Sequence, residues 1–346
     1  NKMNNCSPIF SIITPCYNSE KYIEECINSV LNQNFKDFEF IIVDDGSSDS
    51  SKEIIRNFLK NDNRIKFYSK ENQGQGAQRN FALKEAKGKY VLMLDSDDWL
   101  EENALEKLFN KFQEDETDII LFNGFKFLQD ENLKIPYNYI NVFYKRFQER
   151  SFTPLVEAQD ILFKINGFTF KAYKREFLIK NDIKYSSTRF VEDGEFYIKA
   201  MLCAKKISCL KENILNYRIY PASTTYTQTG RIEDIRYSYN VCRGILKNSP
   251  YGENKNILES FIKNRLRQLF YYYRIASKTN FNTKRKYYGL IKEILKEIKE
   301  EYGFSFIEKK SVLVKYNDII KYPYEFYRFK RGLFLSLILF KQYFEI

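Results

Sequence analysis

The sequence predicts an α/β fold with a parallel sheet, followed by a mostly helical C-terminal region. Strand-like apolar runs alternate with segments of helical spacing over residues 8–94, which is typical of βαβ units. The formal charge is uneven, because residues 231–346 carry +12 whereas residues 1–230 carry −1. This asymmetry predicts two parts, 1–230 and 231–346, the second being basic and rich in aromatic residues.

Short runs rich in Ile, Val, Phe and Leu predict the strands of the sheet. They lie at residues 8–14, 38–44, 64–68, 89–94 and 118–127. Strands that are joined by helices run parallel to one another, so we expect the first four to form a parallel sheet.

Between these strands the apolar residues recur at helical spacing, which predicts a helix in most intervals. Asn18 or Ser19 is expected to cap the first helix, and Ser50 or Ser51 the second. The remaining expectations are helices near 77–86, near 159–166, over 192–204 and from 231 onward, with a loop over 217–229.

The composition excludes several kinds of catalytic site. The chain contains no histidine, which rules out Ser-His-Asp and Cys-His catalysis and any histidine metal site. Acid–base chemistry must therefore come from carboxylates, lysine, tyrosine or cysteine.

The cysteines and apolar runs indicate the compartment. None of the six cysteines forms a C-x-x-C pair, which predicts buried free thiols in a reducing environment. No signal-peptide pattern is visible, and the longest apolar run, 333–340, is too short to span a bilayer. We therefore expect a cytoplasmic protein, with contact to the inner face of the cell membrane as a further expectation treated below.

An acidic cluster follows the strand at 89–94. Asp95, Asp97 and Asp98 come directly after Leu92-Met93-Leu94, so a buried strand should end where carboxylates meet solvent. Clustered carboxylate oxygens suit Mg²⁺ or Mn²⁺, which in turn suit a diphosphate. The alternative is an acidic loop that caps the next helix.

Four segments are expected to meet at one edge of the sheet, because the carboxyl ends of parallel strands share an edge. Together they offer carboxylates, glycines for close backbone approach, an arginine and a metal site, which is the inventory of a nucleotide-diphosphate pocket. The segments are Thr14-Pro15-Cys16-Tyr17-Asn18, Asp44-Asp45-Gly46-Ser47, Gly74-Gln75-Gly76-Ala77-Gln78-Arg79-Asn80 and Asp95-Ser96-Asp97.

This ordered set, together with Glu192-Asp193-Gly194-Glu195-Phe196, resembles the family 2 glycosyltransferases of GT-A fold. The resemblance covers about residues 8–228. It implies a metal-dependent, inverting transfer of a hexose or N-acetylhexosamine from a UDP-sugar to a glycan or lipid-linked glycan of a bacterial surface polysaccharide. The rival interpretation is a non-catalytic module that binds a nucleotide sugar or acts as a scaffold.

The resemblance also implies roles for single residues. Asp97 would be the main protein ligand of Mn²⁺ or Mg²⁺, and Asp193 the general base. In the nucleotide-sugar site, Asp45 would contact the uracil, Asp44 would lie near the nucleoside, and Thr14 and Tyr17 would flank the base and ribose. Arg79 would approach the base or diphosphate, and Asp95 the ribose or a metal-bound water. The site would also include Pro15, Ser96 and Tyr220.

Simpler interpretations compete for several of these residues. Asp44 could cap a turn, and Arg79 could form a surface salt bridge with Asp45. Glu192 and Asp193 could be first-turn helix acids that the helix dipole favours.

One position departs from the family pattern. Family members often carry a histidine near the diphosphate, and here alignment of the flanking residues puts Tyr220 in that place. Tyrosine donates hydrogen bonds but is a poorer neutral metal ligand. Arg218 could supply charge instead, or it could be an ordinary surface arginine.

The basic region 231–346 admits three interpretations. It could be a helical appendage that packs on the catalytic domain, or residues 321–346 could contact an anionic membrane surface. Nucleic-acid binding is not expected, because no recognisable motif supports it.

Overall fold

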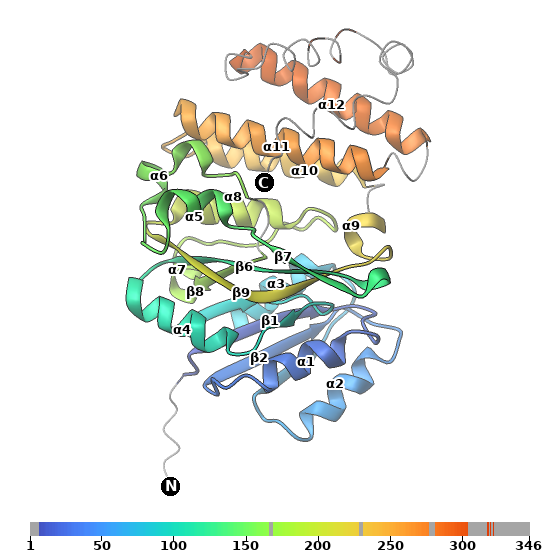
Figure 1. Cartoon of the computed structure of the whole chain (residues 1–346). Coiled ribbons are helices and arrows are strands. Elements are labelled where there is room, and N and C mark those ends of the chain that lie inside the picture. Colours follow the sequence, from blue (N-terminus) through green and yellow to red (C-terminus); the bar gives the residue numbers. More distant parts are fainter. Residues whose placement is uncertain are drawn as a thin grey trace.

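The computed structural model describes residues 7–165, 169–227, 231–276 and 281–303, together with Asn317, Ile319 and Lys321. Within these residues the strands form one nine-stranded mixed sheet with the order β3-β2-β1-β4-β8-β6-β9-β5, and β7 pairs with β6. Helices flank the sheet, and the helices that follow residue 231 stack beyond it (Figure 1). The predicted α/β class is therefore confirmed.

The first half of the sheet is parallel, as predicted. Phe10 on β1 pairs with Phe38 on β2 and with Tyr90 on β4, so the three strands end at the same edge. The elements are β1 (Phe10–Cys16), α1 (Ile23–Leu31), β2 (Phe38–Asp44), α2 (Ser51–Leu59), β3 (Ile65–Ser69), α3 (Gln75–Glu85) and β4 (Tyr90–Met93).

The second half of the sheet mixes directions. Strand β8 (Lys171–Lys174) is antiparallel to β4, and β6 (Ile119–Leu128) is antiparallel to β8. Strand β9 (Ile207–Ile219) runs parallel to β6. Two edge pairings complete the sheet, formed by β5 (Trp99–Leu100) with β9 and by β7 (Leu133–Tyr137) with β6.

The prediction of a loop over 217–229 is wrong, because a strand occupies its first residues and a short helix lies near its end. Strand β9 continues through Tyr217 to Ile219 because β6 is long enough to pair with it, with Lys126 opposite Tyr217. Helix α9 (Thr224–Thr227) follows, and residues 228–229 lie outside the described residues.

The expected helix near 159–166 is also wrong. A short helix α6 (Pro154–Glu157) comes first, and only a 3-10 turn (Gln159–Ile161) follows it. Side chains of helix α11 (Lys255–Ala276) form hydrogen bonds with the backbone beyond that turn. The N–H of Phe163 donates to Ser260 Oγ, and Asn264 donates to the Phe163 carbonyl. Those groups are no longer available to a helix, and Asn166 lies outside the described residues.

Helix α1 begins later than the predicted caps imply. The residue before it is Tyr22, which makes no side-chain capping bond. Ser19 contributes to the start of the helix through its backbone carbonyl oxygen, which accepts hydrogen bonds from the N–H groups of Tyr22 and Ile23. Ser50 precedes α2 but likewise makes no capping bond, and Asp49 accepts from the N–H of Ser51 instead.

The other helices of this part of the chain surround the sheet. Helix α8, over Asp193–Cys203, confirms the helix expected at 192–204. The remaining ones are α4 (Ala104–Asp115), α5 (Asn141–Phe147) and α7 (Arg175–Lys180), with a 3-10 turn at Gln129–Glu131.

The described cysteines fit the predicted free thiols. Cys16, Cys26, Cys209 and Cys242 are buried, and Cys203 is partly buried, without any disulfide among them. Cys6 lies outside the described residues.

The region after residue 231 is helical, as predicted. Helices α10 (Ile232–Lys247), α11 (Lys255–Ala276) and α12 (Phe281–Tyr302) stack beyond α8 in Figure 1. Their buried residues share one hydrophobic cluster with α8, in which Tyr239 and Phe261 join Tyr197 and Met201. This core is shared by helices on both sides of the predicted boundary, and the division into 1–230 and 231–346 stays a prediction.

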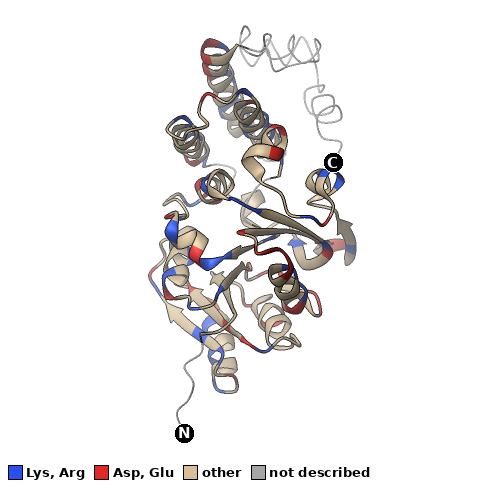
Figure 2. Cartoon of the chain, turned by 90° about the vertical axis from the view of Figure 1, so that its left-hand side faces the viewer, with Lys and Arg blue, Asp and Glu red and all other residues tan. Residues whose placement is uncertain are grey.

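The charges of these helices are partly neutralised by neighbours. Figure 2 shows acidic residues among the basic ones on α10–α12. Arg236 and Arg243 of α10 pair with Glu297 and Glu301 of α12, so ion pairs join the first and last of the three helices.

The proposed membrane segment falls almost wholly outside the described residues, since only Lys321 of 321–346 is described. Among the described helices, none combines the length and apolar character that a bilayer-spanning segment needs.

Candidate functional site

A cavity of about 370 Å³ opens at the edge where β1, β2 and β4 end. Its opposite wall comes from the segment before α8, the residues after β9, and Tyr272 of α11. Most of the predicted site residues line it: Pro15, Tyr17, Asp45, Arg79, Asp95, Ser96, Asp97, Asp193 and Tyr220. The sheet therefore brings together residues that lie up to about two hundred positions apart in the sequence.

Two predicted residues do not line the cavity. Thr14 and Asp44 are both fully buried. Asp44 accepts hydrogen bonds from the N–H groups of Gly46 and Ser47 and from the Ser69 hydroxyl. Asp44 thus shapes the turn after β2, as the turn-capping alternative expected.

Asp45 lies on the cavity and orders the loop before α3. Its carboxylate accepts from the N–H groups of Gln73 at 2.7 Å and Gly74 at 2.9 Å. Gly74 has a φ of 93°, a conformation that side chains rarely adopt. The glycine therefore allows the loop to turn its amides toward Asp45.

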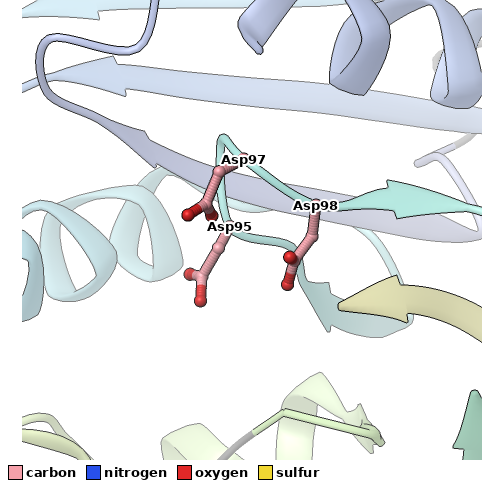
Figure 3. Close-up of side chains that lie close together, drawn as sticks. All are labelled: Asp95, Asp97 and Asp98. Carbon is pink, nitrogen blue, oxygen red and sulfur yellow. The ribbon is translucent and has the colours of Figure 1, made fainter. Parts of the chain in front are cut away.

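The acidic cluster forms one group. Asp95, Asp97 and Asp98 extend from the turn after β4, with carboxylate oxygens within 4.8 Å of one another (Figure 3). Burial and the charge of Asp95 raise the pKa of Asp97 to about 6. Burial, together with the charges of Asp97 and Asp95, also raises the pKa of Asp98. The electrostatics of this turn thus favour a cation.

Tyr220 and Arg218 hold this turn from the end of β9. The Tyr220 hydroxyl donates to the Asp97 carboxylate at 2.9 Å. Arg218 Nε donates to the Asp97 carbonyl at 2.7 Å, and the Arg218 N–H donates to Asp98 Oδ1. Arg218 is 5% exposed and its guanidinium lies over the Trp99 ring. The surface-arginine alternative is therefore wrong.

Arg79 joins the two sides of the cavity. The side chain is 1% exposed and donates to Asp95 at 2.6 Å and to Glu192 at 2.8 Å. The alternative of a surface salt bridge with Asp45 is wrong, because α3 directs Arg79 inward, where its guanidinium lies over the Tyr185 ring. A buried arginine with two carboxylate partners fixes the acidic turn relative to the start of α8.

Asp193 is the first residue of α8 and is partly exposed to the cavity. Burial raises its pKa, while the positive charges of Arg265, Arg79 and Lys171 oppose that rise. Burial also raises the pKa of the neighbouring Glu192 to about 7, against the opposing effect of Arg79. Asp193 is therefore a stronger base than an exposed aspartate.

Three residues of this neighbourhood lie outside the motifs that predicted the site. Tyr272 of α11 lines the cavity, and Arg265 of the same helix is buried beside the start of α8. Lys171 of β8 is fully buried, and burial lowers its pKa to about 7. Only Lys171 gave a signal, because a lysine stands between aromatic residues in a strand-like segment.

Comparison with known proteins agrees with this geometry. A family model described as glycosyl transferase family 2 matches residues 11–181. The chain is 33% identical over 228 residues to "Glycosyltransferase GlyG" of Streptococcus pneumoniae, covering 64% of this chain and 74% of that protein. It is 40% identical over 130 residues to "Putative teichuronic acid biosynthesis glycosyltransferase TuaG" of Bacillus subtilis, covering 37% of this chain and 51% of that protein.

A solved structure extends the likeness to the fold. The crystal structure of S. aureus TarS 1-349 in complex with UDP-GlcNAc matches with a TM-score of 0.68 and 26% identity, covering 83% of this chain and 80% of that chain. The curated relatives first matched are covered over 32% to 74% of their own length.

The family match, the extent of the likeness to GlyG and the TarS-like sheet agree with the ordered motifs around the cavity. The chain belongs to the family 2 glycosyltransferases, and its fold is GT-A.

Proposed function

We propose that the chain transfers a sugar from a UDP-sugar to a hydroxyl of a glycan or lipid-linked glycan, with inversion and with the help of Mn²⁺ or Mg²⁺. The observation that carries this proposal is the pairing of an acidic turn with Asp193 across one cavity, with Arg79 between them. This arrangement provides for the leaving group on one side and for the acceptor on the other.

The donor half comprises the residues at the ends of β1, β2 and β4. Asp45 is proposed to bind the uracil, with Asp44 shaping the turn below it. Tyr17 is 53% exposed beside Pro15 and can cover the base or ribose, while Thr14 supports that strand. Ser96 donates to or accepts from Ser19 at 2.7 Å and fixes the turn that would meet the ribose and phosphates.

The acidic turn fits a hard divalent cation. Its donors are carboxylate oxygens, which Mg²⁺ and Mn²⁺ prefer. Within the described part of the chain, Asp98 Oδ2 is buried without a hydrogen-bond partner, and an unsatisfied buried carboxylate oxygen suits a positive ligand. Asp97 would be the main ligand, and Asp95 would remain held by Arg79.

A bound cation would neutralise the charge that grows on the departing diphosphate. Tyr220 contributes differently from the histidine of other family members, because its hydroxyl already donates to Asp97. It orients that carboxylate rather than serving as a ligand itself.

Asp193 is proposed as the general base. An acceptor hydroxyl is a poor nucleophile near neutral pH, and a carboxylate within hydrogen-bond reach can take its proton during attack. The base lies across the cavity from the acidic turn, which favours a single displacement and inverted anomeric configuration.

The acceptor is proposed to be a growing bacterial surface polysaccharide or glycolipid, since the name of the relative TuaG refers to teichuronic acid biosynthesis. The name of the TarS structure favours UDP-GlcNAc as the first donor to test. The site of action would be the cytoplasm, at the inner face of the membrane where such acceptors are built.

Paired activity and binding assays test the proposal. With Mn²⁺ and UDP-GlcNAc or other UDP-hexoses, the parent chain should release UDP, while Asp193→Asn should lose transfer and keep its affinity for UDP. If the variant transfers sugar as fast as the parent, the base assignment is wrong. If the parent binds a nucleotide sugar but turns over none of a donor panel, the scaffold interpretation gains.

A further inference from the structure

We infer that Arg265 of α11 is the buried counter-charge that keeps Asp193 ionised, so that the helical region supplies a positioning residue to the catalytic centre. This inference rests on the proposed role of Asp193 as the base. It places an essential group about seventy residues beyond the motif that contains the base.

The start of α8 packs directly against helices α10 and α11. A Cβ atom at Gly194 would lie 2.6 Å from Ser238 Oγ of α10 and 3.4 Å from Arg265 Nη1 of α11. Gly194 directly follows Asp193, so only a glycine lets these helices come this close to the base. The guanidinium therefore lies against the backbone that carries Asp193.

Among the described residues, Arg265 is a buried cation that forms no direct ion pair. The side chain is 3% exposed, its Nε donates to Asn264 Oδ1 at 3.0 Å, and its Nη1 lies 3.9 Å from Cys242 Sγ. No ion pair with Asp or Glu is found for it among the described residues. A buried charge is costly unless an opposite charge is near, and Asp193 directly precedes the glycine against which the Arg265 guanidinium lies.

Two other cations, Arg79 and Lys171, also lower the pKa of Asp193, and they are less suited to this role. Arg79 already binds Asp95 and Glu192. Lys171 donates to the Tyr139 hydroxyl and the Thr169 carbonyl, and burial lowers its pKa to about 7, so it carries only a partial charge at neutral pH. Arginine keeps its full charge throughout this range, and Arg265 is first among the cations that oppose the raised pKa of Asp193.

Two further arginines, Arg189 and Arg231, line the same cavity, and Arg189 donates to Asn72 across it. The remaining titratable groups around Asp193 are carboxyl, phenol or thiol groups. They come from α8 itself, from β8 and from the loops and helices packed on them: Glu192, Tyr139, Tyr173, Tyr185, Tyr272 and Cys242. Loss of Arg265 would therefore leave Asp193 harder to ionise. The base would then work only at higher pH.

The pH profile of kcat/KM tests this inference. In Arg265→Met the acid limb should move to higher pH, and the ratio of kcat/KM at pH 8 to that at pH 6 should rise about tenfold over the parent. Arg265→Lys retains a cation and should keep the acid limb close to that of the parent. Affinity for UDP with Mn²⁺ should be unchanged in both variants.

Two further variants keep the test decisive. Cys242→Asp puts a carboxylate beside Arg265, which should divert the guanidinium and move the acid limb in the same direction even if Arg265→Met fails to fold. Arg267→Met is the matched control, because Arg267 lies on the same helix and donates to the Lys164 carbonyl. Its acid limb should match that of the parent.

The outcomes separate the two claims. An inactive Asp193→Asn variant combined with an unmoved acid limb in Arg265→Met and Cys242→Asp overturns the inference alone. An Asp193→Asn variant with parental activity overturns the proposed base, and the inference with it.

Discussion

At the scale of single residues, the site depends on which carboxylates are paired and which are not. Asp95 and Glu192 are held by Arg79, and Asp97 receives the Tyr220 hydroxyl. Asp98 keeps one buried oxygen without a hydrogen-bond partner in the described part of the chain. The carboxylates without a cationic side-chain partner are thus Asp97 and Asp98, where the metal ion is proposed to bind.

Removing the main ligand should abolish metal-dependent transfer. Asp97→Asn keeps the shape of the side chain but removes its charge, so kcat/KM with saturating Mn²⁺ should fall by about a hundredfold or more. A manganese titration of UDP release measures the effect. Asp130→Asn, on the surface turn after β6, should behave as the parent does, and parental activity in Asp97→Asn would contradict the metal assignment.

Tyr220 should matter less than Asp97 because it orients the ligand without binding the cation. Tyr220→Phe removes one hydrogen bond to a charged group, which contributes about 1.5–3 kcal/mol. We expect the manganese concentration for half-maximal activity to rise while kcat at saturating metal stays within about threefold. A loss of kcat as large as that of Asp97→Asn would show that the tyrosine takes part in the reaction more directly.

At the scale of elements, the contact between α8 and α10 positions the base. A Cβ atom at Gly194 would lie 2.6 Å from Ser238 Oγ, whereas a Cβ atom at Gly244 of α10 would meet no neighbour within 4 Å. Substitution by alanine should therefore change the stability of the protein in opposite directions at these two glycines.

Gly194→Ala should destabilise the protein by about 1–3 kcal/mol through overpacking. Gly244→Ala should stabilise it by about 0.5–1 kcal/mol, because alanine is the better helix former and has free space there. Urea denaturation measures both changes, and Ser238→Ala combined with Gly194→Ala should recover part of the loss. Equal effects of the two single substitutions would contradict the close approach of these helices.

Local patterns of apolar residues predicted helices and strands correctly where no distant side chain binds the same backbone. The parallel strands at 38–44 and 89–94 follow from buried apolar runs between helices, and α8 follows from its periodicity. The prediction of a helix near 159–166 was wrong because Ser260 and Asn264, about a hundred residues away, form hydrogen bonds with the backbone of Phe163. No local pattern contains such a distant competitor.

The same reason explains what the sequence did and did not reveal about the site. Asp45, Asp97 and Asp193 stand in short motifs with recognisable spacing, and all three line the cavity. Arg265 and Tyr272 stand in an ordinary amphipathic helix, and only tertiary packing brings them to the site. Arg79 was identified, but its burial between two carboxylates depends on the orientation of α3.

At the scale of the whole molecule, buried carboxylates should make stability depend on pH. The pKa of Asp97 is raised to about 6 and that of Glu192 to about 7. Both groups bind protons more tightly in the folded chain than in the unfolded one, so stability should fall as the pH rises from about 5 to 7.

Thermal unfolding measures this dependence. Without metal, Tm should be higher at pH 5.5 than at pH 7.5. Mn²⁺ should raise Tm more at pH 7.5, because the ionised carboxylates are then available to bind it. A metal-free Tm that rises over this interval, with no larger metal effect at the higher pH, would contradict the raised pKa values.

The central claim is that a cation at Asp97 and the base Asp193 serve one bound UDP-sugar from opposite sides of the cavity. The most direct test is a crystal structure with Mn²⁺ and a UDP-sugar, in which anomalous scattering locates the metal. We predict a manganese peak between the Asp97 carboxylate and the diphosphate, with the anomeric carbon facing Asp193. A diphosphate bound away from Asp97, or a manganese ion held by other residues, would contradict the account.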